Sequence, residues 1–399
     1  MIGRDRPDIW LLLSIAVVFA IGLATIYSAS TAIAERGIFQ RQLVWSFLGI
    51  GAFLLGTLIS FRRLEEISPA VYVLVCLLLL LTVFLGRGPA GRWLIAGPIH
   101  IQASETAKVG LILVTAWWLS SLKVRPRKFG ELLVFLTVLP VVLLTAVQPD
   151  LGTAVSMLLI VLAMFVWAGY GMGWIVLMVS PVLAAVSSIH FHYWLGFMAV
   201  LSIILYRRRY SVPMWILIIG GNSLVAALTP TAWDMLEPYQ QSRLVTFMNP
   251  ASDPHGSGWN IIQSEVAVGS GGLAGQGYMQ GSQKELAFLP ARHTDFVFSV
   301  WAEETGFIGC MALLSAFFIL FWRIVKVAGK SVNPYNSLVT AGIAAYFLIH
   351  VFVNVGMTLG MMPVTGLPLP LISYGGSQLL SVFFLLGLVT NAGMYWREV

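Results

Sequence analysis

The stretch that decides the fold reads HTDFVFSVWAEETGFIGCMALLSAFFILFW, residues 293–322. From Phe296 to Trp322 it is mainly apolar, and at 1.5 Å per residue a helix of this length can cross a bilayer. His293, Thr294 and Asp295 stand at its mouth. A carboxylate at that depth can meet the polar head group of a lipid while the tail stays in hydrocarbon, so we expect chemistry at this junction.

The composition is that of a membrane protein. Hydrophobic residues make up 58% of the chain and charged residues 10%, which leaves too few polar groups to cover a soluble globule of 399 residues. Cys76 and Cys310 both lie in apolar runs, so the sequence predicts neither a disulfide framework nor a thiolate metal site. The first apolar stretch, 9–29, is too long for a signal-peptide core and is interpreted as a retained span.

Apolar runs of spanning length predict an all-α polytopic membrane protein with about twelve transmembrane helices. No break in composition divides the chain, so we expect one membrane domain over 1–399, with a long loop at 230–295 inside it. The expected helices cover residues 9–29, 43–60, 70–86, 106–121, 132–147, 151–169, 173–189, 192–206, 213–229, 296–322, 337–361 and 378–395.

The distribution of basic residues orients these helices. With the N-terminus in the cytoplasm, the inner side holds 15 of the 23 basic residues, which is the positive-inside tendency of short loops. Both termini are then cytoplasmic and the long loop faces outward. Because topology explains the basic clusters, the net charge of +6 gives no reason to expect a nucleic-acid partner.

Several outward segments carry side chains suited to a polar head group. Arg41 precedes the second span, Arg92 precedes Trp93, and Glu105 and Lys108 stand at the mouth of the fourth span. Glu105 and Lys108 are three residues apart, so on a helix they share a face and can pair. The structural alternative is an interfacial ion pair with Trp93 as an anchor.

Two further segments combine polar groups with irregular backbone. Asp150 lies in the turn 148–153, where it either takes part in a site or simply caps the sixth helix. Pro363, Pro368 and Pro370 cannot sustain a regular helix, so 366–378 should be re-entrant or broken. Irregular backbone at membrane depth survives only inside protein or beside a wet cavity.

Asp295 also has a structural alternative, as N-cap of a helix that starts at Phe296. The reciprocal Glu or Gln of a capping box is missing, because position N3 would be Phe298. Glu303 lies roughly 12 Å deeper along the same helix. Intramembrane carboxylates are usually functional or paired, and of Glu303 and Glu304 we expect only Glu303 to face the cavity of Asp295.

The glycines of the long loop do not form a phosphate-binding loop, since no strand precedes them and no Gly-Lys-Ser/Thr follows. Residues 259–268 have the amphipathic pattern of a short helix on the membrane surface. We expect the Gly-rich turns after it to let the chain fold over a head group.

Six ordered motifs resemble the shape, elongation, division and sporulation family, and the resemblance runs from Arg41 to the C-terminus. They are QPDLGT (148–153), DPHGSG (253–258), GSQ (281–283), FLPARHTDF (288–296), EETGFIG (303–309) and LPLPLISYGGS (367–377). Most members have ten spans. Residues 173–229 hold three apolar runs where one is usual, so we expect an additional pair of helices here.

The resemblance implies a peptidoglycan glycosyltransferase that polymerises lipid II at the outer face of the bacterial cytoplasmic membrane. Its catalytic carboxylate is Asp295, which would accept the proton of the acceptor 4-hydroxyl. The other residues carried into the site as substrate-binding are Arg41, Arg92, Glu105, Lys108, Asp150, Gln283, His293, Thr294, Glu303, Ser373 and Ser377.

The leaving group would be undecaprenyl pyrophosphate on the growing glycan, and it must meet positive charge. The candidates are Arg41, Arg92, Lys108, Arg243, Lys284 and Arg292, or a divalent cation (Mg²⁺ or Mn²⁺) held by Glu105 or Asp150. The family also implies a class B penicillin-binding protein as transpeptidase partner, together with the elongation machinery. Two rival classes remain: a lipid-linked sugar flippase, and a noncatalytic scaffold for the transpeptidase.

Overall fold

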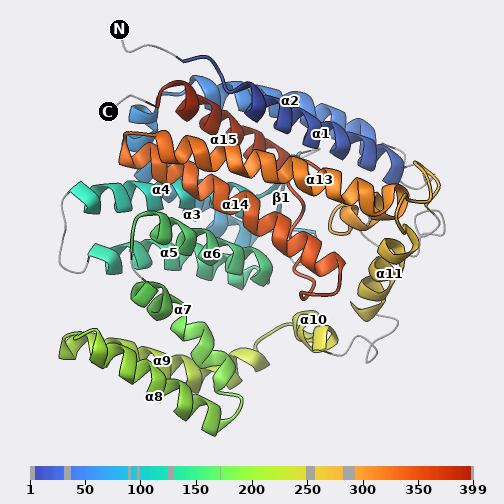
Figure 1. Cartoon of the computed structure of the whole chain (residues 1–399). Helices are drawn as coiled ribbons and strands as arrows, with labels where there is room; N and C mark the ends of the chain where they lie inside the picture. The colour runs from blue at the N-terminus through green and yellow to red at the C-terminus, as the bar shows by residue number, and fades with distance from the viewer. Residues whose placement is uncertain are drawn as a thin grey trace. The chain divides into compact units, whose positions relative to one another are not determined.

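The computed structural model describes residues 5–30, 37–88, 91–96, 99–124, 130–170, 172–248, 257–281 and 293–396. Its helices are α1 (Ile9–Ala29), α2 (Ile38–Leu58), α3 (Phe61–Leu85), α4 (Ala103–Val124), α5 (Gly130–Val147), α6 (Leu151–Trp167), α7 (Met172–Ser187), α8 (Phe191–Arg207), α9 (Val212–Asp234), α10 (Pro238–Met248), α11 (Ser257–Ser270), α13 (Val297–Lys330), α14 (Pro334–Thr358) and α15 (Gly376–Met394). The whole chain is drawn in Figure 1.

All twelve expected apolar stretches form helices, α1 to α9 and α13 to α15. Within the described residues, seven helices are long and apolar enough to cross a membrane: α1, α2, α3, α9, α13, α14 and α15. Exposed apolar side chains such as Phe47 (78%) and Phe84 (76%) cover their outer faces, as a lipid-facing surface requires. The chain is therefore a multi-pass helical membrane protein.

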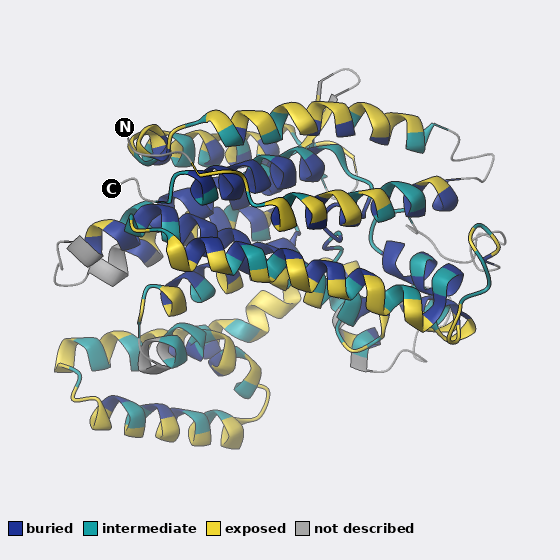
Figure 2. Cartoon of the chain, turned by 45° about the horizontal axis from the view of Figure 1, so that its top comes forward, coloured by how far each residue is buried: buried dark blue, intermediate teal, exposed yellow. Residues whose placement is uncertain are grey.

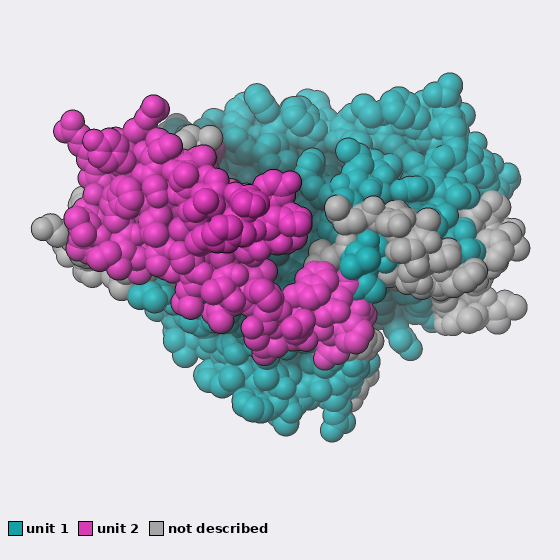
Figure 3. Space-filling view, turned by 90° about the horizontal axis from the view of Figure 1, so that it is seen from below, with its two compact units in different colours: residues 1–164, 242–399 teal, residues 165–241 magenta. Residues whose placement is uncertain are grey.

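Contacts between Cα atoms divide the chain into two units, coloured separately in Figure 3. Unit 1 contains 1–164 and 242–399, and unit 2 contains 165–241. In unit 2, α7, α8 and α9 pack on one another, and Leu201 and Leu205 of α8 lie in an apolar cluster with residues of α9. That 1–399 forms one membrane domain stays a prediction.

Unit 1 carries the junction at Asp295. In it, α13 packs between α1 and α14, and α2 packs along α15 (Figure 1). Buried residues, dark blue in Figure 2, gather on the inner helices. Gly49 and Gly56 of α2 face the α15 residues Phe383 and Phe384. Small residues at such contacts let membrane helices approach closely.

The sequence interpretation missed a short hairpin. Strands β1 (Trp93–Ala96) and β2 (Ile99–Gln102) pair antiparallel, with Trp93 opposite Gln102 and Ile95 opposite His100. These two strands are only four residues each, too short to stand out from the apolar pattern beside them. All other named elements in the described residues are helices, and the hairpin leads directly into α4.

The segment expected as a loop at 230–295 contains helices in its described parts. Helix α9 continues through Pro230 to Asp234, and α10 and α11 follow. The predicted short helix at 259–268 is confirmed as part of α11. Its Ser264 is buried and bonds to Ser299 of α13 at 2.6 Å, so α11 packs on protein there.

Helix α13 is broken at Gly306, which has φ 66° and ψ −164°. The turn at 271–277 docks on this break. Gln276 N and Gly277 N donate to the carbonyls of Glu303 and Glu304 at 3.0 and 3.1 Å. In return, residues 307 and 308 donate to the carbonyls of residues 272 and 273. The Gly-rich turn thus satisfies backbone groups that the break leaves unpaired, a need that is acute inside a membrane.

Candidate active site

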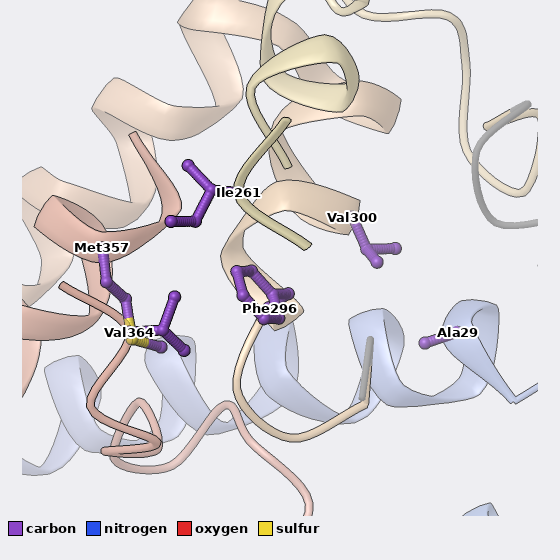
Figure 4. Packing of buried hydrophobic residues seen from close by; sticks show 6 residues of the cluster. All are labelled: Ala29, Ile261, Phe296, Val300, Met357 and Val364. Atoms are coloured by element: carbon purple, nitrogen blue, oxygen red, sulfur yellow. The ribbon is translucent and has the colours of Figure 1, made fainter. Parts of the chain in front are cut away.

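Asp295 is not the N-cap of α13, so the capping alternative is wrong. The helix begins at Val297 and its N-cap is Phe296, without a side-chain cap bond. Phe296 is 2% exposed and anchors the helix start in an apolar cluster with Val300 and Met357 (Figure 4). Asp295 therefore lies just before the helix, and the next residue, Phe296, is buried in the apolar cluster.

The backbone of 293–295 is held by three consecutive hydrogen bonds. The carbonyls of 293, 294 and 295 accept, in that order, from Tyr374 N (2.8 Å), Ser373 Oγ (2.6 Å) and Asn354 Nδ2 (2.9 Å). Ser373 Oγ in turn accepts from the backbone of Leu369 at 2.8 Å. The irregular segment predicted at 366–378 is present up to residue 375, and it binds the backbone of 293–295. The prediction was wrong for 376–378, because α15 already begins at Gly376.

The environment of Asp295 raises the pKa of its side chain on balance. The residue is partly exposed, yet surrounding protein desolvates the carboxylate, and this burial raises its pKa above the ordinary value. Nearby Asp150 acts in the same direction. Arg243, the hydrogen bond from Thr294 and the more weakly acting Arg92 oppose the rise in the pKa. A carboxylate with a raised pKa is a stronger base once it is ionised.

The missing side chain of Gly366 leaves a gap of about the size of a methyl group beside the Asp295 carboxylate and the Arg243 guanidinium. A Cβ built on Gly366 would lie 3.6 Å from Asp295 Oδ2 and 3.9 Å from Arg243 Nη1. Gly366 has φ 73°, a conformation that favours glycine. A carboxylate and a guanidinium therefore approach one small space that has no side chain of its own.

Asp150 caps α6 and also pairs with Arg92. Thr153 N donates to Asp150 Oδ1 at 3.4 Å, which is the capping role considered from the sequence. Arg92 Nη1 lies 3.6 Å from the same oxygen. Arg92 also donates to the carbonyls of Gln148 (3.1 Å) and Pro149. Arg92 is thereby fixed to the turn before α6.

The hairpin joins this turn to α15. Gln102 Nε2 and Ser104 Oγ each lie 3.5 Å from Asp150 Oδ2. Ser377 Oγ accepts from Gln102 N at 3.1 Å and donates to the carbonyl of His100 at 3.2 Å. Ser377 is therefore placed as a brace between the hairpin and the start of α15.

Glu105 and Lys108 form the predicted pair, at 2.8 Å. Lys108 is 0% exposed; its Nζ also lies 3.0 Å from His350 Nε2 and 5.3 Å from the centre of the Tyr346 ring. His350 Nδ1 lies 2.9 Å from the Tyr346 carbonyl, so Nδ1 carries the proton and Nε2 accepts from Lys108. The ammonium is enclosed by α4 and α14.

Glu303 and Glu304 are both buried, and each turns to a different neighbour. Glu304 accepts a hydrogen bond from Ser28 of α1. Glu303 Oε2 would lie 2.6 Å from a Cβ on Gly281, so glycine there makes room for the carboxylate. His293 packs edge-on against Tyr374, with ring centres 5.8 Å apart.

Of the remaining predicted residues, Arg41 is exposed on α2. Gln283 and the basic candidates Lys284 and Arg292 lie outside the described residues. Among the described residues, no three His, Cys, Asp or Glu side chains are grouped to hold a metal. The two carboxylates considered for a divalent cation, Glu105 and Asp150, each already pair with a basic side chain, so this donor set does not fit a metal.

Two residues of the site were not found from the sequence. Asn354 reaches the backbone of Asp295 from α14, and Gly366 borders the gap. A buried amide in an otherwise apolar span is a usable signal for Asn354, because polar side chains inside membranes are costly and generally partnered. The sequence offers no comparable signal for Gly366.

The chain is similar to known proteins over nearly its whole length. A model of the cell cycle protein family of FtsW, RodA and SpoVE matches residues 8–196 and 193–398. The peptidoglycan glycosyltransferase RodA of Treponema pallidum is 33% identical, with 98% of each chain covered. The peptidoglycan glycosyltransferase MrdB of Escherichia coli K12 is 32% identical, covering 97% of this chain and 92% of the relative.

Solved structures share the fold. A chain from a peptidoglycan synthase complex, studied for the coordination of polymerization and crosslinking, superposes with a TM-score of 0.70 at 30% identity, covering 98% of this chain and 99% of that one. The rod shape determining protein RodA of Thermus thermophilus gives a TM-score of 0.63 at 28% identity, with 96% and 95% covered.

Proposed function

The chain belongs to the cell cycle protein family of FtsW, RodA and SpoVE and is a peptidoglycan glycosyltransferase, and we propose that it polymerises lipid II with Asp295 as the catalytic base. The observation that carries this proposal is the position of one carboxylate. Asp295 stands ahead of an apolar helix, in a rigidly held backbone, and opens on a gap that Arg243 also borders.

A single base is sufficient for this reaction. The acceptor 4-hydroxyl would attack the anomeric carbon of the lipid-linked glycan, and its proton would pass to the Asp295 carboxylate. The new C–O bond forms on the face opposite the leaving undecaprenyl pyrophosphate, which departs with the electron pair of the broken C–O bond and gives inversion. Because that leaving group is already good, the paired carboxylates of glycoside hydrolysis are not needed.

Among the basic candidates that the structure describes, Arg243 is the one whose guanidinium borders the gap at Gly366 beside Asp295. Lys108 is enclosed by Glu105 and His350, and Arg92 is held by Asp150 and two carbonyls. Arg243 Nη1 and Asp295 Oδ2 would both lie within 4 Å of a Cβ on Gly366. A guanidinium there would stabilise negative charge as it develops on the leaving group.

The proposed topology follows from the basic residues and the twelve apolar helices. About twelve spans, ten of the family type and one additional pair within 173–229, leave both termini in the cytoplasm. The long loop at 230–295 and Asp295 would then lie at the outer face of the cytoplasmic membrane. This is the side on which a lipid-linked wall precursor is polymerised.

We also propose a class B penicillin-binding protein as partner, within the elongation machinery. The support is the structural likeness to a chain from a complex in which polymerization and crosslinking are coordinated. A transpeptidase held next to the polymerase would receive strands as they are made.

Purified protein with labelled lipid II tests the catalytic role. Asp295→Asn should lower polymerisation by roughly 10²–10⁴-fold, the usual contribution of a positioned base. Asp8→Asn is the matched control, because it makes the same change in a carboxylate that instead pairs with Arg323. Unchanged polymerisation by Asp295→Asn would contradict the role of Asp295 as the base. Absence of polymer from the wild-type protein would support a scaffold, and translocation of lipid without polymer would support a flippase.

A further inference from the structure

The carbonyl of Asp295 lies outside the hydrogen-bond ladder of α13. In the first turn Ser299 N donates to the carbonyl of Phe296 at 3.1 Å, three residues back, so the carbonyl of Asp295 is passed over. Asn354 supplies the donor in its place, with Nδ2 at 2.9 Å. The same nitrogen donates to the carbonyl of Leu367 at 2.8 Å.

The direction of this amide is fixed by its partners. Both neighbours are carbonyl oxygens, so only the NH₂ end of Asn354 can face them, and both of its hydrogens are used. Asn354 is 0% exposed. One side chain therefore satisfies two carbonyls of irregular backbone in a region where no water replaces a lost donor.

The carbonyls of Asp295 and Leu367 belong to two segments that both border the gap. Asp295 carries the proposed base, and Leu367 directly follows Gly366, which borders the same space. Ser373 makes a second connection between the two segments, through the carbonyl of Thr294 at 2.6 Å. The distance between Asp295 and residues 366–367 is thus set by hydrogen bonds from two side chains, Asn354 and Ser373, because the backbone of both segments is irregular.

We infer that Asn354 is a positioning residue that holds Asp295 at a fixed distance from 366–367, with Ser373 in the same role one residue earlier. This inference rests on the proposed function of Asp295. Base catalysis needs its groups held to within about 0.5 Å, and a displacement of about 1 Å can cost roughly 10²-fold in rate. Loss of these donors should act on the chemical step and leave lipid binding unchanged.

Asn391 provides a matched control. Its Nδ2 also donates to two carbonyls, those of Thr57 and Ile59 at 2.7 and 2.9 Å, and it is 3% exposed. It lies fifteen positions after Gly376, the first residue of α15, and therefore roughly 22 Å further along that helix. Asn354→Leu and Asn391→Leu therefore remove the same number and kind of hydrogen bonds.

The experiment measures lipid II polymerisation and thermal unfolding of both variants in detergent. Both should unfold at lower temperature. Only Asn354→Leu should lower kcat, by roughly 10-fold to 10²-fold, with KM within about twofold of wild type and a shifted acid limb of the pH–rate profile. Equal kcat in the two variants, or a loss in Asn354→Leu that appears only in KM, would overturn the inference.

Ser373→Ala decides the question if Asn354→Leu does not fold. Its control is Ser68→Ala, which removes a buried hydroxyl that bonds to Leu64 and Tyr335. A selective loss of kcat in Ser373→Ala supports positioning, and equal kcat contradicts it. Asp295→Asn is measured alongside: if it stays active, the proposed function fails, whereas an inactive Asp295→Asn with unaffected Asn354 and Ser373 variants refutes positioning alone.

Discussion

The ammonium of Lys108 lies 3.0 Å from Nε2 of His350, with both side chains fully buried between α4 and α14. Together with Glu105, the pair forms a charged group inside the protein. Isolated charge there is costly, and mutual pairing is what makes the group tolerable.

Removing Lys108 alone should therefore be worse than removing the whole ion pair. Lys108→Met leaves the Glu105 carboxylate buried without its cation and should destabilise the protein by about 3–5 kcal/mol. The double variant Glu105→Gln, Lys108→Met replaces both charges and should recover much of that loss. Denaturation in detergent measures the stability of both variants. A double variant as unstable as Lys108→Met would show that the unpaired Glu105 charge is not the cause of the destabilisation.

Removing Arg243 should shift the pH dependence of the reaction. Burial raises the pKa of Asp295, and Arg243 opposes that rise. Activity is lost as pH falls through this pKa, because a protonated carboxyl cannot accept a proton. Arg243→Gln should thus move the acid limb of kcat/KM to higher pH and also raise KM. Arg323→Gln, whose guanidinium pairs with Asp8, should leave the limb in place.

Filling the gap above Gly366 should impair catalysis more than stability. Gly366→Ala places a methyl group near Asp295 and Arg243, in addition to a backbone strain of about 1–2 kcal/mol. Gly169→Ala has comparable strain, at φ 91°, with open space around it. We expect similar unfolding temperatures and a much lower polymerisation rate for Gly366→Ala; equal rates would mean that the gap is not used.

The docking of the Gly-rich turn on α13 can be tested with two neighbouring glycines. Gly275 and Gly272 both have positive φ, 81° and 51°, but only at Gly275 would a Cβ collide with the carbonyl of Glu304. Gly275→Ala should therefore lower both stability and activity well below Gly272→Ala. Comparable effects of the two substitutions on unfolding temperature would argue against close backbone approach as the requirement.

Local patterns were enough to predict the helices. Long apolar runs have few alternatives to a helix in a bilayer, because every backbone group must be satisfied within the segment. The same logic predicted the irregular segment before α15, where prolines remove the helical option. The Glu105 and Lys108 pair followed from a spacing of three residues on one helix face.

The rest depended on approaches between segments far apart in the chain. The sequence alone left Asp295 as a cap or a base, since its position one residue before the N-cap is set by how Phe296 packs. Nor could it choose among the basic residues, because Lys108 and Arg92 are occupied by neighbours from other helices and turns.

Periodicity and composition by themselves determined that this chain is a bundle of membrane helices and that Asp295 precedes one of them, because burial in lipid constrains each segment separately. Only the tertiary structure decided what surrounds that residue. The donors of Asn354 and Ser373, the gap at Gly366 and the approach of Arg243 are contacts between segments. Such contacts depend on packing between helices, which no local pattern of residues encodes.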